Sequence, residues 1–161
     1  PGHVGSDYEK LRPEFRIITD PYSGKDVCLV PPIIPDVALI HALAADRVGN
    51  LLLEEKEDDF LLAQASRVVI ASAERIVETA ELRRADYGVF LQEIYVVAVA
   101  PLPGGAHPTP VRGAYRLDER HLLEYLARAA SDESFQGYLD RYVFEPKDHR
   151  EYLERVGLPL P

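Results

Sequence analysis

Residues 103–108 hold the densest group of side chains and glycines in this sequence that could take part in chemistry. Gly104 and Gly105 lack a Cβ atom, so their backbone N–H groups can approach an anionic or carbonyl oxygen closely. His107 can donate a hydrogen bond or move a proton near neutral pH. An apolar strand is expected to end at Ala100, and loops that follow parallel strands lie at the ligand-binding edge of a sheet. We therefore predict that Gly104, Gly105 and His107 bind substrate.

The same loop has a structural explanation that stays open. Two glycines between prolines form an ordinary turn, and a single loop histidine is commonly structural. Loops at strand ends nevertheless carry functional residues more often than other surface segments do. The sequence alone does not separate these two roles for Gly104, Gly105 and His107.

Ser6 is a further candidate for substrate binding, because it follows Gly5 near the beginning of the sequence. If a strand preceded Pro1, the Ser6 hydroxyl would lie in a similar loop at a strand end. Ser6 and Asp7 also fit the cap of a short helix over residues 8–11, which is the more common role for these residue types.

Other polar groups in the sequence are better explained by local structure. His41 ends an apolar run, and residues 46–50 contain the Asp, Gly and Asn that turns require. Cys28 lies in an apolar strand, where a cysteine behaves as a small hydrophobic residue. The acidic run at residues 54–59 forms a solvated and electrostatically favourable entrance to a helix.

Several well-known functional motifs are missing from the sequence. It contains no G-x-G-x-x-G or Walker A nucleotide-binding motif, no G-x-S-x-G elbow, no H-E-x-x-H and no C-x-x-C. The histidines do not share an element at metal-ligand spacing. They are His3, His41, His107, His121 and His149. We therefore predict no metal ligands and no bound cofactor, and we assign no catalytic residue within the chain.

The strand-rich region from residue 15 to residue 100 is expected to position the candidate loop. Residues 15–19 and 26–30 flank a turn-forming Asp-Pro-Tyr-Ser-Gly segment and predict an antiparallel pair. Three apolar runs are typical of parallel strands that are covered on both faces: residues 36–42, 67–73 and 93–100. A helix over residues 58–65 would connect the first two of these strands in a β-α-β unit.

The helical C-terminal portion, residues 118–157, shows apolar residues at helical spacing. Helices are expected after Asp118 and after Ser131, and a third has Pro146 in its first turn and Gly157 at its end. Together with the strands, this pattern predicts an open, mostly parallel α/β sheet flanked by helices. We expect residues 1–161 to form a single domain or part-domain, because three strands make a thin sheet.

Composition excludes several classes of partner. The 161 residues include 18 Lys plus Arg and 27 Asp plus Glu, a net charge of −9, which argues against nucleic acid or a membrane surface as a partner. A single cysteine, Cys28, cannot form an internal disulfide and suits the cytoplasm. The absence of methionine leads us to expect that the sequence begins inside a larger polypeptide.

The ordered motifs resemble the alpha subunit of family I CoA-transferases, of the glutaconate CoA-transferase type. The resemblance covers residues 5–157 and corresponds to the C-terminal half of that subunit. It rests on the following segments in family order: Gly5-Ser6-Asp7, residues 36–50, residues 67–73, Gly105-Ala106-His107-Pro108, Gly113-Ala114-Tyr115 with Asp118, residues 138–143 and residues 147–153. Each motif is weak alone, and their succession is fairly specific.

This resemblance implies a Rossmann-like CoA-transferase fold and the exchange of CoA between an acyl-CoA thioester and a free carboxylic acid. In the family, a glutamate in a Ser-Glu-Asn-Gly-like context attacks the thioester, and backbone donors stabilise each oxyanion. This sequence contains no such motif, nor the family's Gly-rich N-terminal turn. The resemblance therefore implies a hetero-oligomer with a beta-type subunit, a separate N-terminal half of the alpha subunit, and a chain that is inactive alone.

Two alternatives stay open at the level of sequence. Relatives on the same scaffold hydrolyse cyclic CoA esters or decarboxylate glutaconyl-type CoA esters, and a fold does not choose among such reactions. The chain could also be a non-catalytic subunit that stabilises its partner.

Overall fold

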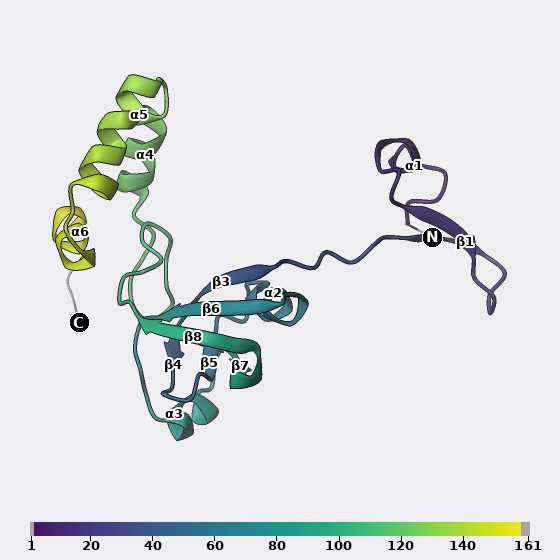
Figure 1. The fold of residues 1–161 in the computed structure, drawn as a ribbon, viewed down its shortest axis with the longest axis horizontal. Coiled ribbons are helices and arrows are strands. Elements are labelled where there is room, and N and C mark those ends of the chain that lie inside the picture. The colour runs from purple at the N-terminus through teal and green to yellow at the C-terminus, as the bar shows by residue number, and fades with distance from the viewer. Residues whose placement is uncertain (1, 159–161) are drawn as a thin grey trace. The chain divides into compact units, whose positions relative to one another are not determined.

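The computed structural model describes residues 2–158. The chain forms two compact units, Pro1–Ile34 and Pro35–Pro161, each with its own secondary structure (Figure 1). That residues 1–161 behave as a single domain or part-domain stays a prediction.

The smaller unit contains helix α1 (Tyr8–Leu11) and a hairpin of strands β1 (Arg16–Thr19) and β2 (Asp26–Leu29). The two strands pair antiparallel, as predicted. The Asp20 carboxylate accepts hydrogen bonds from the backbone N–H groups two and three residues later, at 3.3 and 3.1 Å, which closes the turn between the strands.

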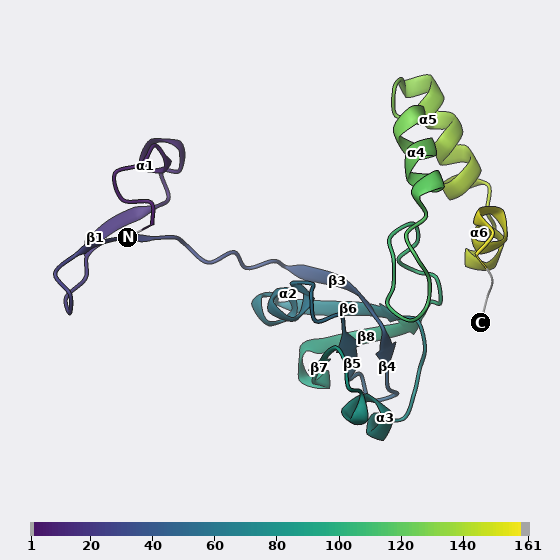
Figure 2. The same ribbon diagram turned by 180° about the vertical axis from the view of Figure 1, so that it is seen from behind.

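The larger unit is built on a three-stranded parallel sheet. Strands β3 (Val37–Ala42), β6 (Val68–Ala73) and β8 (Val96–Pro101) lie in the order β3-β6-β8 (Figures 1 and 2). Helix α2 (Asp59–Ala65) lies between β3 and β6 in the sequence, so the predicted β-α-β unit is confirmed. The third strand begins later than predicted, because a 3₁₀ turn, η1 (Glu93–Tyr95), precedes it.

A second, antiparallel sheet, built from the segments that connect β3 to β6 and β6 to β8, was not expected from the sequence. It consists of β4 (Ala44–Ala45), β5 (Leu51–Leu53) and β7 (Val89–Leu91), and helix α3 (Thr79–Arg84) precedes β7. The turn between β4 and β5 is held by the buried carboxylate of Asp46.

The core of the larger unit covers only one face of the parallel sheet. Alternate residues of β3 and β6 are buried on this face, where they pack with α2, β5 and β7. The opposite residues Val37, Leu39 and Ile70 are exposed. Within the larger unit taken by itself, the prediction that these strands are covered on both faces is therefore wrong.

The C-terminal portion forms the predicted helices. They are α4 (Glu119–Arg128), α5 (Asp132–Leu139), which continues as a π-helical turn, η2 (Asp140–Phe144), and α6 (His149–Val156). Asp118 and Ser131 cap α4 and α5 as predicted, and Gly157 ends α6 in the left-handed conformation. Pro146 was wrongly placed in the first turn of the last helix, because the Asp148 side chain caps α6 instead.

No helix within residues 2–158 has both the length and the apolar character needed to cross a lipid bilayer. The open, mostly parallel α/β architecture with C-terminal helices is confirmed.

Candidate functional site

The candidate site lies at the edge of the parallel sheet where its strands end. Because β3, β6 and β8 run in the same direction, their C-terminal ends meet at this edge. His41 is the penultimate residue of β3, Glu74 directly follows β6, and Gly104 lies in the loop after β8. Three segments that are distant in the sequence therefore contribute to one place.

Glu74 is the centre of this site, and its side chain is only 10% exposed. Its Oε1 atom lies 2.6 Å from His41 Nε2 and accepts a 2.8 Å hydrogen bond from the Tyr115 hydroxyl. Its Oε2 atom accepts a 2.9 Å hydrogen bond from the Gly104 N–H. His41 Nδ1 lies 2.8 Å from Ser72 Oγ, so both ring nitrogens of His41 have partners.

Tyr115 connects Glu74 to the candidate loop. Its hydroxyl accepts a 3.0 Å hydrogen bond from the Ala106 N–H and donates to Glu74. Burial of the ring raises the pKa of Tyr115 well above its usual value, and the hydrogen bond to Glu74 adds to this shift. Tyr115 therefore stays protonated and keeps its role as donor across the physiological pH range.

The two predicted glycines are required by close packing. A Cβ atom on Gly105 would lie 2.8 Å from His41 Cε1 and 2.8 Å from the Leu102 carbonyl oxygen. Gly104 has a φ of +74°, and a Cβ there would lie 2.7 Å from Leu153 Cδ2. The N–H of Gly104 donates to Glu74, and that of Gly105 donates to Leu102. Substrate binding by these donors stays a prediction, and it requires an oxyanion to replace the present acceptors.

His107 turns its ring toward the C-terminal helices. The side chain is 3% exposed, with Nδ1 2.7 Å from the Tyr152 hydroxyl and Nε2 3.2 Å from Asp118 Oδ2. The pKa of Asp118 is lowered, chiefly by the hydrogen bond from the backbone N–H of His121 and further by His107. His107 thus fastens the candidate loop to α4 and α6, and its contact with substrate stays a prediction.

His107, Asp118 and His121 form the group that could hold a divalent cation in the described part of the chain. One ligand atom from each lies within 4.8 Å of the other two. Burial and the neighbouring His107 lower the pKa of His121, which favours its neutral form. Three of the four ring nitrogens already have partners, however: both nitrogens of His107, and His121 Nε2, which lies 2.8 Å from the Tyr138 hydroxyl. These hydrogen bonds give the cluster a structural role, because they connect the 103–108 loop and the C-terminal helices.

A cavity of about 860 Å³ lies beside the Glu74 network, with His41 and Ala106 in its wall. Its volume is in the range of small-molecule sites. Two cationic side chains, Lys56 and Arg112, line it together with three acidic ones. The acidic residues are Glu54, Glu57 and Asp59. Burial raises the pKa of Asp59, and its neighbours Glu57 and Asp58 raise it further.

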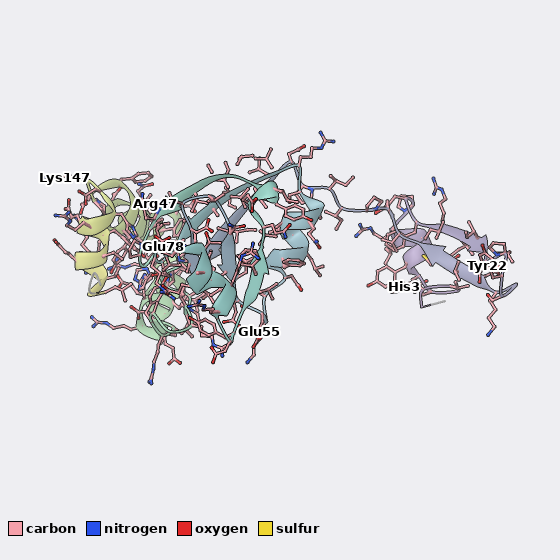
Figure 3. The ribbon with its side chains drawn as sticks, turned by 90° about the horizontal axis from the view of Figure 1, so that it is seen from below. His3, Tyr22, Arg47, Glu55, Glu78 and Lys147 are labelled. Carbon is pink, nitrogen blue, oxygen red and sulfur yellow. The ribbon has the colours of Figure 1, made fainter. Side chains whose placement is uncertain are left out.

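The cationic side of the cavity is partly neutralised. Arg112 Nη1 lies 3.7 Å from Glu54 Oε1 and 3.4 Å from Glu55 Oε1. Glu55, labelled in Figure 3, belongs to the segment between β5 and α2. The cavity wall therefore offers a weaker site for phosphate groups than its arginine suggests.

Ser6 lies in the smaller unit and has a local role there. Its hydroxyl donates a 2.7 Å hydrogen bond to the His3 carbonyl and lies 3.4 Å from the Tyr8 N–H, at the beginning of α1. Binding of substrate by Ser6 stays a prediction.

Sequence reasoning missed Glu74, the residue that joins three segments of the site. Glu74 is the first charged residue after an apolar strand, which is the same signal that singled out the loop after β8. His41 was assigned to local turn structure, whereas the structure places it against Glu74 and the cavity. The contact between His41 and Glu74 joins residues more than 30 positions apart, and sequence spacing gives no measure of such contacts.

Comparison with known proteins identifies the family. Residues 3–90 match the Coenzyme A transferase family. An alignment of 160 positions that covers 96% of this chain gives 33% identity to the A-type subunit of 3-oxoadipate CoA-transferase from Pseudomonas knackmussii. The structure of glutaconate CoA-transferase from Acidaminococcus fermentans matches 89% of the chain with a TM-score of 0.79 and 33% identity. The chain therefore belongs to the Coenzyme A transferase family.

A solved decarboxylase is also similar. The structure of a cysteine-to-serine variant of the decarboxylase AibA/AibB matches 84% of the chain and 50% of its own, with a TM-score of 0.68 and 36% identity. The chain spans about half the length of these relatives, 55% of the Pseudomonas protein and 46% of the Acidaminococcus chain.

Proposed function

We propose that this chain is the C-terminal part of an alpha-type CoA-transferase subunit, which exchanges CoA between an acyl-CoA thioester and a free carboxylic acid. The observation that carries the proposal is the cavity beside His41 and the Gly104–His107 loop, at the strand ends of a sheet with the family fold. The CoA thioester is a substrate, and no further cofactor is needed for acyl exchange.

The nucleophilic glutamate belongs to a partner chain in this proposal. Glu74 is poorly suited to attack a thioester, because its two oxygens accept hydrogen bonds from Gly104 and Tyr115 and contact His41. Breaking these contacts would cost several hydrogen bonds to a buried carboxylate. Glu74 instead holds in place the residues that form one wall of the cavity. In this proposal, the Gly104–His107 loop belongs to that wall and faces the acyl group.

The proposed assembly is a cytoplasmic hetero-oligomer of this chain, a beta-type subunit, and a separate N-terminal half of the alpha subunit. Its support is that the chain spans about half of its relatives, two of which are named as A-type subunits. The net charge of −9 fits neither nucleic acid nor an anionic membrane as a partner. The chain alone is expected to be inactive, because these 161 residues contain no counterpart of the family's nucleophile motif.

The alternative is a decarboxylase or hydrolase of CoA esters on the same scaffold. The similarity to the AibA/AibB decarboxylase favours it, since that structure is as similar in sequence as the transferase is. Fold similarity does not separate these reactions.

An assay of the reconstituted complex separates them. Loss of acyl-CoA is measured with and without an acceptor carboxylic acid, with free CoA and the new thioester quantified. The proposal expects that consumption requires the acceptor and forms a second thioester. Consumption without an acceptor would establish the alternative, and equal turnover by the partners without this chain would make it a non-catalytic subunit.

A further inference from the structure

Three side chains of the metal-binding type meet where the 103–108 loop contacts the C-terminal helices. They are His107 of the loop, Asp118 at the N-cap of α4, and His121 in the first turn of α4. The His107 side chain is 3% exposed, and His121 is buried. All three belong to the larger unit. The prediction of no metal ligands rested on spacing along the sequence, whereas these groups are brought together by the fold.

The donor set and its spacing fit a zinc ion. Zinc sites with three protein ligands combine imidazole nitrogens with a carboxylate oxygen and leave a fourth position for water. Bonds of about 2.0–2.2 Å place neighbouring ligand atoms of a tetrahedral site roughly 3.3 Å apart. His107 Nε2 and Asp118 Oδ2 lie 3.2 Å apart, close to that spacing. One nitrogen of His121 lies within 4.8 Å of both ligand atoms, so a movement of at most about 1.5 Å completes the set.

The three side chains are also held by outer partners of the kind that metal ligands have. A histidine that binds a metal usually donates its second ring N–H to an oxygen, which fixes the orientation of the ring. His107 Nδ1 lies 2.7 Å from the Tyr152 hydroxyl, and His121 Nε2 lies 2.8 Å from the Tyr138 hydroxyl. Asp118 Oδ1 accepts a 2.9 Å hydrogen bond from the His121 N–H, which leaves Oδ2 directed at His107.

His121 Nδ1 is the ring nitrogen that the hydrogen-bond network leaves over. Among the described residues it has no hydrogen-bond partner, whereas both nitrogens of His107 and His121 Nε2 have one. A neutral imidazole with one nitrogen bonded to a tyrosine hydroxyl has a lone pair to give to a metal through the other. The cluster therefore offers nitrogen and oxygen donors that local hydrogen bonding does not use up.

We propose that His107, Asp118 and His121 bind a zinc ion that fastens the 103–108 loop to helix α4. The ion replaces the hydrogen bond between His107 Nε2 and Asp118 Oδ2. His107 then carries its proton on Nδ1 and donates it to the Tyr152 hydroxyl. The site lies in this chain alone and does not depend on the reaction that the assembled enzyme catalyses.

Asp118 is the ligand on which the charge balance of the site depends. The N-terminus of α4 carries a partial positive charge, which disfavours a cation, and the carboxylate of Asp118 offsets it. Asparagine at this position keeps the N-cap, because Asn and Asp cap helices about equally well, but it removes the negative charge. Asp118→Asn therefore separates metal binding from folding.

The experiment titrates the full chain, freed of metal by a chelator, with zinc chloride in a calorimeter. We expect the wild type to bind one zinc ion per chain. Tyr138→Phe removes only an outer partner and should raise the Kd roughly 10- to 100-fold, and Asp118→Asn and His121→Gln should raise it further. His3→Gln is the matched control, because His3 belongs to the smaller unit, and it should leave the Kd unchanged.

Three outcomes would overturn the proposal. They are the absence of zinc binding to the wild type, equal affinities of the wild type and Asp118→Asn, and loss of binding in His3→Gln, which would place the ion in the smaller unit. Circular dichroism of each variant without zinc checks that it remains folded. The readout is metal binding, so the result is independent of whether the assembled enzyme transfers, hydrolyses or decarboxylates.

Discussion

Glu74 shows how a single carboxylate can organise a site at the level of the residue. An ionised carboxylate only accepts hydrogen bonds, and each of its oxygens can accept more than one. Here the donors come from the end of β3, the loop after β8 and Tyr115, which lies farther along the chain. A buried acceptor with this many donors cannot lose one oxygen without leaving a donor unpaired.

Glu74→Gln tests this arrangement through stability. The amide keeps one oxygen but places an NH₂ group against at least one donor, so we expect a loss of roughly 1–3 kcal/mol in the free energy of unfolding. Urea unfolding followed by circular dichroism measures it. Glu154→Gln is the control, because Glu154 is exposed on α6, and its effect should lie within about 0.5 kcal/mol. Equal effects of the two substitutions would show that the Glu74 contacts add nothing to stability.

Asp46 makes the stability of the chain depend on pH. Burial raises the pKa of this carboxyl, but hydrogen bonds from Asn50, Thr79 and the backbone outweigh burial and lower the pKa to about 2. A folded pKa below the unfolded value of about 3.9 contributes stability above pH 4, and this contribution disappears as the pH falls toward 2. The contribution at neutral pH is roughly 2–3 kcal/mol.

The corresponding measurement compares wild type with Asp46→Asn from pH 7 to pH 2. We expect the difference in unfolding free energy between the two proteins to be largest near neutral pH and to shrink between pH 4 and pH 2. If the difference in unfolding free energy stays constant over this range, Asp46 is not the group whose titration changes the stability.

At the level of elements, the loop after β8 is held by close packing between backbone and side chains. Gly105→Ala places a methyl group 2.8 Å from both His41 Cε1 and the Leu102 oxygen, so backbone or ring must move. We expect a loss of roughly 1–3 kcal/mol in thermal or urea unfolding. Gly137→Ala is the opposite control, since nothing lies near a Cβ there and alanine favours helix α5, with an expected gain of about 0.5–1 kcal/mol. A neutral Gly105→Ala would contradict the tight fit.

The sequence predicted those elements whose signals are local. The β1–β2 pair, the β3-α2-β6 unit, and the caps Asp118 and Ser131 were all found from residue type and spacing. The β4–β5–β7 sheet was missed because its strands have only two or three residues, too few to show periodicity. Continuous apolar strands suggested burial on both faces, whereas within the larger unit Val37, Leu39 and Ile70 are exposed on one face.

The position of the candidate loop was predicted from the sequence, and its role in binding substrate stays a prediction. The loop with Gly104, Gly105 and His107 lies at the strand edge, as parallel topology requires. The orientation of His107 toward Tyr152, and the position of Glu74, depend on contacts across more than 30 residues. These contacts follow from tertiary packing, for which a single sequence contains no periodic signal.

At the level of the whole molecule, net charge and length both support the proposed assembly with partner chains. A net charge of −9 repels the phosphates of CoA, and the cavity arginine Arg112 is already paired with Glu54 and Glu55. In the assembly proposed above, cations for the CoA phosphates are therefore expected to come from the partner subunits. The chain spans about half the length of its relatives, so the assembly proposed above would supply the remaining part together with these cations.

The carboxylate of Glu74 has a mechanical consequence as well. Because it links the end of β3, the turn at Gly104 and the ring of Tyr115, these segments shift together when any one of them is displaced. Under the proposed function, a bulkier acyl chain would fit only if all three segments moved together. We therefore expect the preference among acyl groups in the proposed reaction to depend on the size of the side chains that line the cavity, and substitution of those side chains to change it.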